Sequence, residues 1–163
     1  MRPVFFVAAL TACTSAAAAA PQTAASPLAF FEGRTVMEGT TKVVMRKPYR
    51  ARSVGLGRIE SDGALLLVQQ VEEGGEPRKE RRWHIRRVAA NRFSGTMSDA
   101  VGPVTVDQIG GRFRFRFRMK GGLAVEQWLT PHADGKTAGS SLTVRKLGLQ
   151  VASGQAVIRK VAE

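Results

Sequence analysis

The chain has 163 residues, and lysine and arginine together number 25 against 13 acidic residues, which gives a net charge of +12. This length accommodates one domain with a hydrophobic core, but not two ordinary domains once an export signal is removed. An apolar fraction of 44%, with 17 glycines and 7 prolines, excludes a disordered or collagen-like chain. The single cysteine excludes an internal disulfide, and with two histidines beside it no zinc site is expected. We therefore predict one globular domain without a metal or other cofactor, and the composition points to no reaction.

The first twenty residues have the layout of a secretory signal. Arg2 precedes an apolar stretch from Val4 to Leu10, and small residues follow it. One interpretation places cleavage within the alanine run 16–20. The other treats Leu10-Thr11-Ala12-Cys13 as a bacterial lipobox, in which Cys13 is lipidated and becomes the new amino terminus. Both predict export, either to the periplasm or, with the lipid anchor, to the outer membrane.

A tether is expected between this signal and the folded domain. The stretch from Thr14 to Ser26 carries no charge and is dominated by small residues, so we assign residues 21–27 to the tether. The domain then spans residues 28–163. Its one expected helical turn lies at Leu28–Glu32.

From Phe30 onward the apolar residues recur with a period of two, which is typical of strands. The clearest run, Arg112–Met119, places three phenylalanines and Met119 on one face and four arginines on the other. The same pattern along the chain predicts ten strands. They are Thr35–Arg46, Arg50–Glu60, Ala64–Glu73, Lys79–Val88, Arg92–Met97, Val104–Ile109, Arg112–Met119, Leu123–Thr130, Ser140–Lys146 and Gly154–Val161.

Short connections between these strands predict antiparallel pairing. Asp62-Gly63 and Gly121-Gly122 supply the positive φ angles that a two-residue hairpin turn needs. An all-β meander of eight to ten strands without an internal repeat is expected to close into a barrel, since closure removes exposed sheet edges. A β-sandwich is the alternative.

Four stretches, in this order and spacing, resemble a family of bacterial envelope lipoproteins known as domain of unknown function 3833. They are Phe31-Glu32-Gly33-Arg34, Arg81-Arg82-Trp83-His84-Ile85, the nine residues from Gly95 to Pro103, and Arg145-Lys146-Leu147-Gly148. The resemblance covers roughly residues 30 to 160. It implies a lipocalin-like barrel in the cell envelope, and it implies no established activity.

The sequence departs from that family's pattern in two places. Glu126-Gln127-Trp128 stands where a pair of aspartates followed by tryptophan is usual, and Ser140-Ser141 stands where an Asn-Arg pair is usual. A role that depends on the second acid therefore does not carry over to this chain.

Aromatic side chains are the candidates for a ligand site. The interior of a small barrel is either filled by side chains or holds one apolar ligand. The candidate ligand-binding residues are Trp83, Phe113, Phe115, Phe117, Glu126 and Trp128. Core packing is the simpler interpretation, because any half-buried strand needs such an alternation. Ligand binding additionally requires an open mouth and an interior volume.

The direction of Glu126 depends on the register of the hairpin around Gly121-Gly122. With a two-residue turn, Phe117 pairs with Glu126 and Phe115 with Trp128, so the carboxylate points into the barrel. We favour this register.

An inward carboxylate needs a basic partner, because an unpaired buried charge is costly. The candidate partners are Arg81, Arg87 and Arg145. With a three-residue loop, Glu126 instead meets Arg118 outside the barrel and Trp128 lies against Arg116, where both contacts carry little functional weight.

The outward arginines are candidates for contact with an anionic membrane surface. They are Arg82, Arg86, Arg112, Arg114, Arg116 and Arg118. A solvated surface is the alternative. Nucleic acid is not an expected partner, because the chain is exported and its aromatic residues lie on the opposite face.

We predict a non-enzymatic, lipocalin-like binder or carrier of a lipid or small amphiphile. The alternatives are an enzyme acting on an envelope lipid, with Glu126 or Asp99 as its acid, and a purely structural envelope protein. No catalytic residue is assigned, because His84 is expected on the outer face and His132 in a turn. The sequence predicts no oligomeric state.

Overall fold

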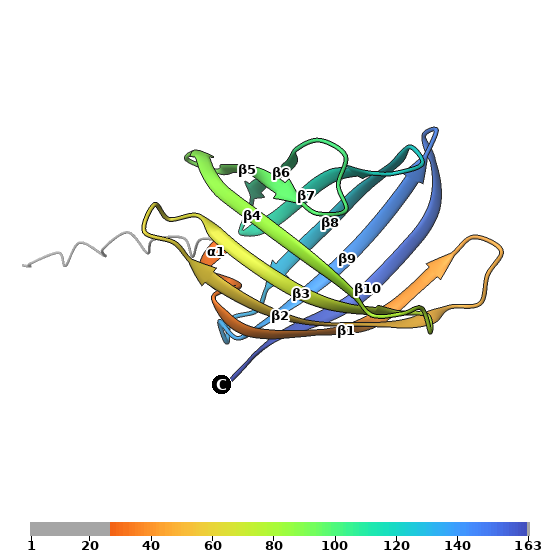
Figure 1. The fold of residues 1–163 in the computed structure, drawn as a ribbon, viewed down its shortest axis with the longest axis horizontal. Coiled ribbons are helices and arrows are strands. Elements are labelled where there is room, and N and C mark those ends of the chain that lie inside the picture. Colours follow the sequence, from red (N-terminus) through yellow and green to blue (C-terminus); the bar gives the residue numbers. More distant parts are fainter. Residues whose placement is uncertain (1–26, 163) are drawn as a thin grey trace, which may run out of the picture.

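Ten antiparallel strands and one short helix make up the protein in the computed structural model, which describes residues 27–162 (Figure 1). The elements are α1 (Pro27–Phe30), β1 (Gly33–Val43), β2 (Tyr49–Ile59), β3 (Leu65–Glu73), β4 (Lys79–Ala89), β5 (Arg92–Met97), β6 (Val104–Ile109), β7 (Arg112–Met119), β8 (Leu123–Pro131), β9 (Thr137–Lys146) and β10 (Leu149–Val161). The predicted signal, Cys13 and the tether as far as Ser26 lie outside the described residues.

The strands form one closed sheet. Each strand pairs with its neighbours in sequence, and β1 pairs with β10 to complete the ring. The predicted all-β meander barrel is therefore confirmed, and the sandwich is excluded. No helix among residues 27–162 is long and apolar enough to span a membrane.

The end of the chain differs most from the predicted strands. β10 begins at Leu149 and not at Gly154, because a two-residue turn at Leu147-Gly148, with φ angles of 51° and 83°, joins it directly to β9. The stretch after this turn contains a register shift between Gln150 and Ala152. This irregularity removes the simple alternation on which the prediction depended.

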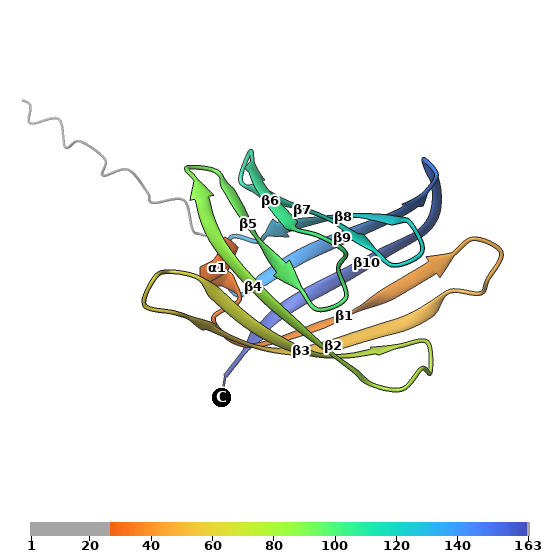
Figure 2. The same cartoon turned by 45° about the horizontal axis from the view of Figure 1, so that its top comes forward.

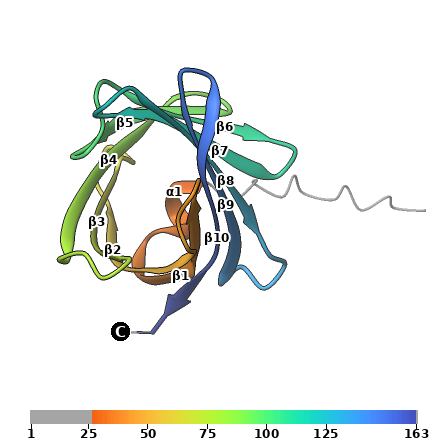
Figure 3. The same cartoon turned by 90° about the vertical axis from the view of Figure 1, so that its right-hand side faces the viewer.

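The helix α1 closes one end of the barrel. Leu28 and Phe31 are buried, and the ring of Phe31 meets that of Phe115 edge to face at 6.4 Å. Gly57 allows this close approach, because a Cβ at that position would lie 1.9 Å from the carbonyl oxygen of Phe31. The view along the barrel shows α1 at its far end (Figure 3).

The densest part of the core lies in the half of the barrel next to α1. The largest fully buried side chains are Phe93, Leu65, Ile85, Leu129, Val104 and Val106. Towards the other end the inward side chains, such as Met37 and Leu142, are only partly buried. The connections β1–β2, β3–β4, β7–β8 and β9–β10 project from this second end, which we call the open end (Figure 2).

Candidate functional site

A cavity of about 390 Å³ occupies the open half of the barrel. It is lined by inward side chains of strands on both sides of the barrel. One wall, from β7 to β9, is apolar towards the mouth, where it includes Met119, Leu123, Val125, Leu142 and Val144, and carries Gln127 and Ser140 farther in. The inward alternation of these strands therefore produces an apolar surface that reaches the mouth.

The opposite wall is more polar. Tyr49 of β2, Glu73 of β3 and Arg81 of β4 lie there. Burial and the neighbouring Glu73 carboxylate raise the pKa of the Tyr49 phenol, which therefore stays neutral at physiological pH. The two walls together present an amphipathic surface to the interior.

A smaller cavity of about 60 Å³ lies deeper, towards α1. Its lining is mostly apolar and includes Leu28, Phe31 and Phe115. The residues that line both cavities, and so mark the boundary between them, are Met37, Arg81, Trp83 and Gln127. A basic group, an indole and an amide thus surround the floor of the larger cavity.

Arg81 is the charged group at this boundary. Its side chain is 18% exposed, and its Nε–H donates to Oδ2 of Asp99 at 3.0 Å. Ser98 Oγ donates to the other oxygen of Asp99 at 3.2 Å. A guanidinium carries five N–H donors, and within residues 27–162 the terminal nitrogens of Arg81 have no hydrogen-bond partner. These donors remain available to a ligand.

Two further hydrogen bonds fix polar side chains around Arg81. Trp83 Nε1–H donates to Gln69 Oε1 at 2.7 Å, and Gln127 Nε2–H donates to Ser140 Oγ at 2.7 Å. The indole ring of Trp83 also packs edge to face against Phe115 and Phe117, at 6.4 Å and 5.7 Å. The floor of the cavity is consequently held in one arrangement.

Four of the predicted ligand-binding residues point into the barrel. Trp83 and Phe117 line the larger cavity, and Phe115 lines the deeper one. Phe113 is buried, 3% exposed, and lines neither cavity. The barrel is therefore filled by side chains in the half next to α1 and hollow in the open half. Each of the two predicted alternatives, a filled interior and an open one, describes one half.

The predicted inward position of Glu126 is wrong. Met119 pairs with Leu123, so the connection is a three-residue loop, and Phe117 faces Val125 instead of Glu126. Both Gly121 and Gly122 adopt positive φ, as expected, but Lys120 joins the loop. A shift of one residue moves every side chain to the other face.

Glu126 and Trp128 lie on the outer face of β8. Trp128 Nε1–H donates to Glu126 Oε1 at 3.3 Å. The guanidinium of Arg112 lies 4.4 Å from the centre of the Trp128 ring, and that of Arg114 lies 5.6 Å away. In the register of β7 and β8, Glu126 lies opposite Arg116, whereas the three-residue alternative predicted Arg118 in that position.

Only one of the three proposed partners for an inward acid belongs to the cavity. Arg81 points inward as expected, but it binds Asp99. Arg87 is exposed and stacks on Phe93 at 4.6 Å, and Arg145 is exposed. The Arg81–Asp99 pair was missed because the two residues are far apart in sequence and Asp99 lies in a loop.

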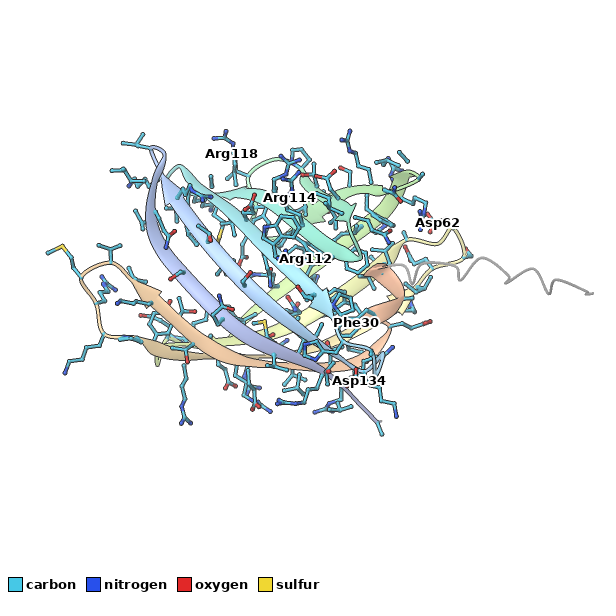
Figure 4. The ribbon with its side chains drawn as sticks, turned by 180° about the vertical axis from the view of Figure 1, so that it is seen from behind. Phe30, Asp62, Arg112, Arg114, Arg118 and Asp134 are labelled. Carbon is cyan, nitrogen blue, oxygen red and sulfur yellow. The ribbon has the colours of Figure 1, made fainter. Side chains whose placement is uncertain are left out.

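Some of the outward arginines form ion pairs with nearby acidic residues. Arg92, Arg114 and Arg116 surround the carboxylate of Asp107 at 3.1, 3.3 and 2.8 Å. Arg82 pairs with Glu80 at 2.7 Å. Figure 4 shows Arg112, Arg114 and Arg118 along the outside of the barrel. Contact of this surface with a membrane stays a prediction.

Asp107 is the most tightly held acid on this surface, with a side chain that is 11% exposed. Burial alone raises the pKa of this carboxyl, but the hydrogen bonds and positive charges of the three arginines outweigh it, and the pKa lies below its ordinary value. The carboxylate therefore stabilises the folded state above its unfolded pKa, and this contribution is lost as the pH falls through the folded pKa.

Replacing Asp107 by asparagine is expected to lower the free energy of unfolding at pH 7 by about 1–3 kcal/mol, since three arginines lose a shared partner. The deficit should shrink on acidification, when the parent carboxylate is protonated as well. Urea denaturation at several pH values measures it, with Glu76→Gln as the control because Glu76 is exposed. A deficit that is constant down to low pH would show that the charge of Asp107 is not the cause.

The closed meander with an internal cavity defines a lipocalin-like barrel. The chain belongs to the DUF3833 family of proteins of unknown function, whose sequence profile matches residues 5–160. The family resemblance of the sequence is thus confirmed.

Among solved structures, the fold is similar to that of the S-type phycobiliprotein lyase CPES from Guillardia theta. The TM-score is 0.66 with 7% sequence identity, over 83% of this chain and 91% of that chain. At this identity the similarity concerns the fold. No curated protein matches the sequence at a significant level.

Proposed function

We propose that the protein is a non-enzymatic binder or carrier of a small amphiphile that carries an anionic or strongly polar end. The observation that carries the proposal is the cavity of about 390 Å³, with the largely buried side chain of Arg81 at the boundary that forms its floor. Small-molecule sites in proteins usually have volumes of about 300–1,000 Å³ and few, well-placed polar groups. Both properties fit this cavity.

The two walls suggest how such a ligand lies. Its polar end accepts hydrogen bonds from Arg81, near the amide of Gln127. Its apolar body packs along Leu123, Val125 and Leu142 towards the open end. Burial of that body supplies the affinity, because it removes apolar surface from water.

An enzymatic role is the second candidate, because the structural neighbour is named a lyase. The described residues that line the two cavities include no histidine and no cysteine, and Glu73 is the acid among them. Asp99 is paired with Arg81, and Glu126 is outside. These positions favour a binder over an enzyme, and recovery of the bound ligand unchanged after prolonged incubation separates the two.

Titration with a fluorescent fatty-acid probe tests the proposal. The chain has two tryptophans, so a Trp128→Phe protein reports on the cavity through Trp83 alone. We expect saturable binding of one probe per chain and a change in Trp83 emission. A Leu142→Phe, Val144→Phe protein, in which the cavity is narrowed, should bind more weakly. Absence of saturable binding by the Trp128→Phe protein would favour a structural envelope protein.

We also propose that the protein is exported to the cell envelope and anchored there through a lipid on Cys13. The support is the sequence pattern of residues 1–20. Cys13→Ser should then release the protein from the membrane fraction, because several acyl chains anchor a protein stably. A mature amino terminus within residues 16–20 would instead show a cleaved, periplasmic protein.

A further inference from the structure

Large apolar side chains stand at the tips of two connections at the open end. Met45, between β1 and β2, is fully exposed, and Leu147, between β9 and β10, is 93% exposed. Val44 and Leu149 beside them are 56% and 74% exposed. Both connections project from the open end of the barrel (Figure 1), and the cavity is lined by Val43 and Val144 close to them.

The backbone conformation at these tips does not favour large apolar side chains. Met45 and Leu147 have φ angles of 62° and 51°, a conformation that favours glycine and asparagine. Apolar side chains here gain nothing from the turn and nothing from the core. Their exposure indicates a surface that meets an apolar phase.

Basic residues surround the same tips. The segments 42–48, 118–122 and 145–149 contain no acidic residue. Their basic residues are Lys42, Arg46, Lys47, Arg118, Lys120, Arg145 and Lys146. None of these seven forms an ion pair with another residue in the described part of the chain. Of the nearby acidic residues, Glu73 and Glu76 belong to the end of β3 and to the β3–β4 connection, next to β2, and the carboxylate of Asp99 is paired with Arg81.

We infer that this rim docks on an anionic phospholipid bilayer, with Met45 and Leu147 inserted between the headgroups. Such a bilayer is apolar in its interior and negatively charged at its surface. It therefore complements exposed apolar residues that are surrounded by basic residues without ion-pair partners. A second copy of the chain does not match it, because two such rims repel each other. Nucleic acid satisfies the charges but leaves the apolar tips in water.

Docking in this orientation turns the mouth of the cavity towards the bilayer. A membrane-soluble ligand then passes between the two without crossing open water. The docking itself does not depend on the proposed function and is tested without any ligand.

The experiment measures binding of the full chain to vesicles of phosphatidylcholine alone and of phosphatidylcholine mixed equally with phosphatidylglycerol. We expect the parent to prefer the mixed vesicles, with a preference that weakens at high salt. Met45→Asn with Leu147→Asn should weaken binding about tenfold, because asparagine suits the left-handed turns and removes the apolar tips. All these proteins share one N-terminal segment, so differences between them report on the barrel.

Two matched controls separate the rim from the rest of the surface. Leu56→Thr with Val68→Thr removes an exposed apolar pair from the side wall and should leave binding unchanged. Lys47→Gln with Lys146→Gln should weaken binding about tenfold, whereas Arg34→Gln with Arg58→Gln, a pair of exposed arginines at the end of the barrel next to α1, should have little effect.

Three results would overturn the inference. The first is parent-like binding by the asparagine variant. The second is equal loss in the rim and side-wall variants. The third is a parent that binds single-stranded DNA at low salt but not the mixed vesicles. Circular dichroism establishes that each variant is folded.

Discussion

Replacing Arg81 by glutamine is expected to weaken the binding of an anionic amphiphile by about 10- to 100-fold. Hydrogen bonds to charged groups contribute about 1.5–3 kcal/mol, and every 1.4 kcal/mol is a factor of ten in affinity. The side chain is largely buried at the floor of the cavity, so solvent screens it little. Titration of the fluorescent fatty-acid probe gives the dissociation constants.

Arg86→Gln is the matched control for this prediction. Arg86 lies on the same strand, its change in charge is identical, and it points out of the barrel into solvent. The affinities of the parent and of Arg81→Gln for a neutral probe, such as the corresponding alcohol, should differ much less than their affinities for the acid. Equal losses for the two arginine variants would show that net charge, and not the cavity, determines binding.

Replacing Phe115 by alanine is expected to lower the free energy of unfolding by about 3–5 kcal/mol, the usual cost of truncating a buried phenylalanine. Phe115 is 7% exposed and contacts the rings of both Phe31 and Trp83. Its removal therefore loosens the helix that closes the barrel as well as the floor of the cavity. Guanidinium denaturation, followed by tryptophan fluorescence, measures the loss.

Leu56→Ala serves as the control, because Leu56 is a strand residue that is 59% exposed. Its effect should stay within about 0.5 kcal/mol. A loss below about 1 kcal/mol for Phe115→Ala would be inconsistent with a packed closed end.

Strand periodicity predicted the fold well because the two faces of these strands have opposite environments. The run Arg112–Met119 coincides with β7, with its phenylalanines buried and its arginines towards solvent or other polar groups. The period of two encodes which residues share a face, and barrel closure follows from ten such strands in series.

Register was less predictable, because it depends on a single residue in a loop. Lys120 belongs to the connection between β7 and β8, and this moves Glu126 and Trp128 outside. Gly121-Gly122 fits both turn lengths, since positive φ angles occur in each. The sequence offers no local signal that separates them.

The ion pairs depend on contacts between distant segments. Asp99 reaches Arg81 from the β5–β6 connection, and Asp107 gathers arginines from two other strands. The division of the interior into a filled and an open half likewise depends on where Phe31, directly after α1, packs against Gly57. These features arise only when the barrel is assembled, so the periodicity along one strand does not predict them.

Native mass spectrometry of the purified full chain with a mixture of fatty acids of different lengths tests the central claim most directly. The binder is predicted to retain one fatty acid per chain, with a preferred length set by the cavity, and Arg81→Gln should lose most of this complex. An absence of any complex, or several fatty acids bound without preference in both proteins, would contradict the claim that the barrel holds an amphiphile in its cavity.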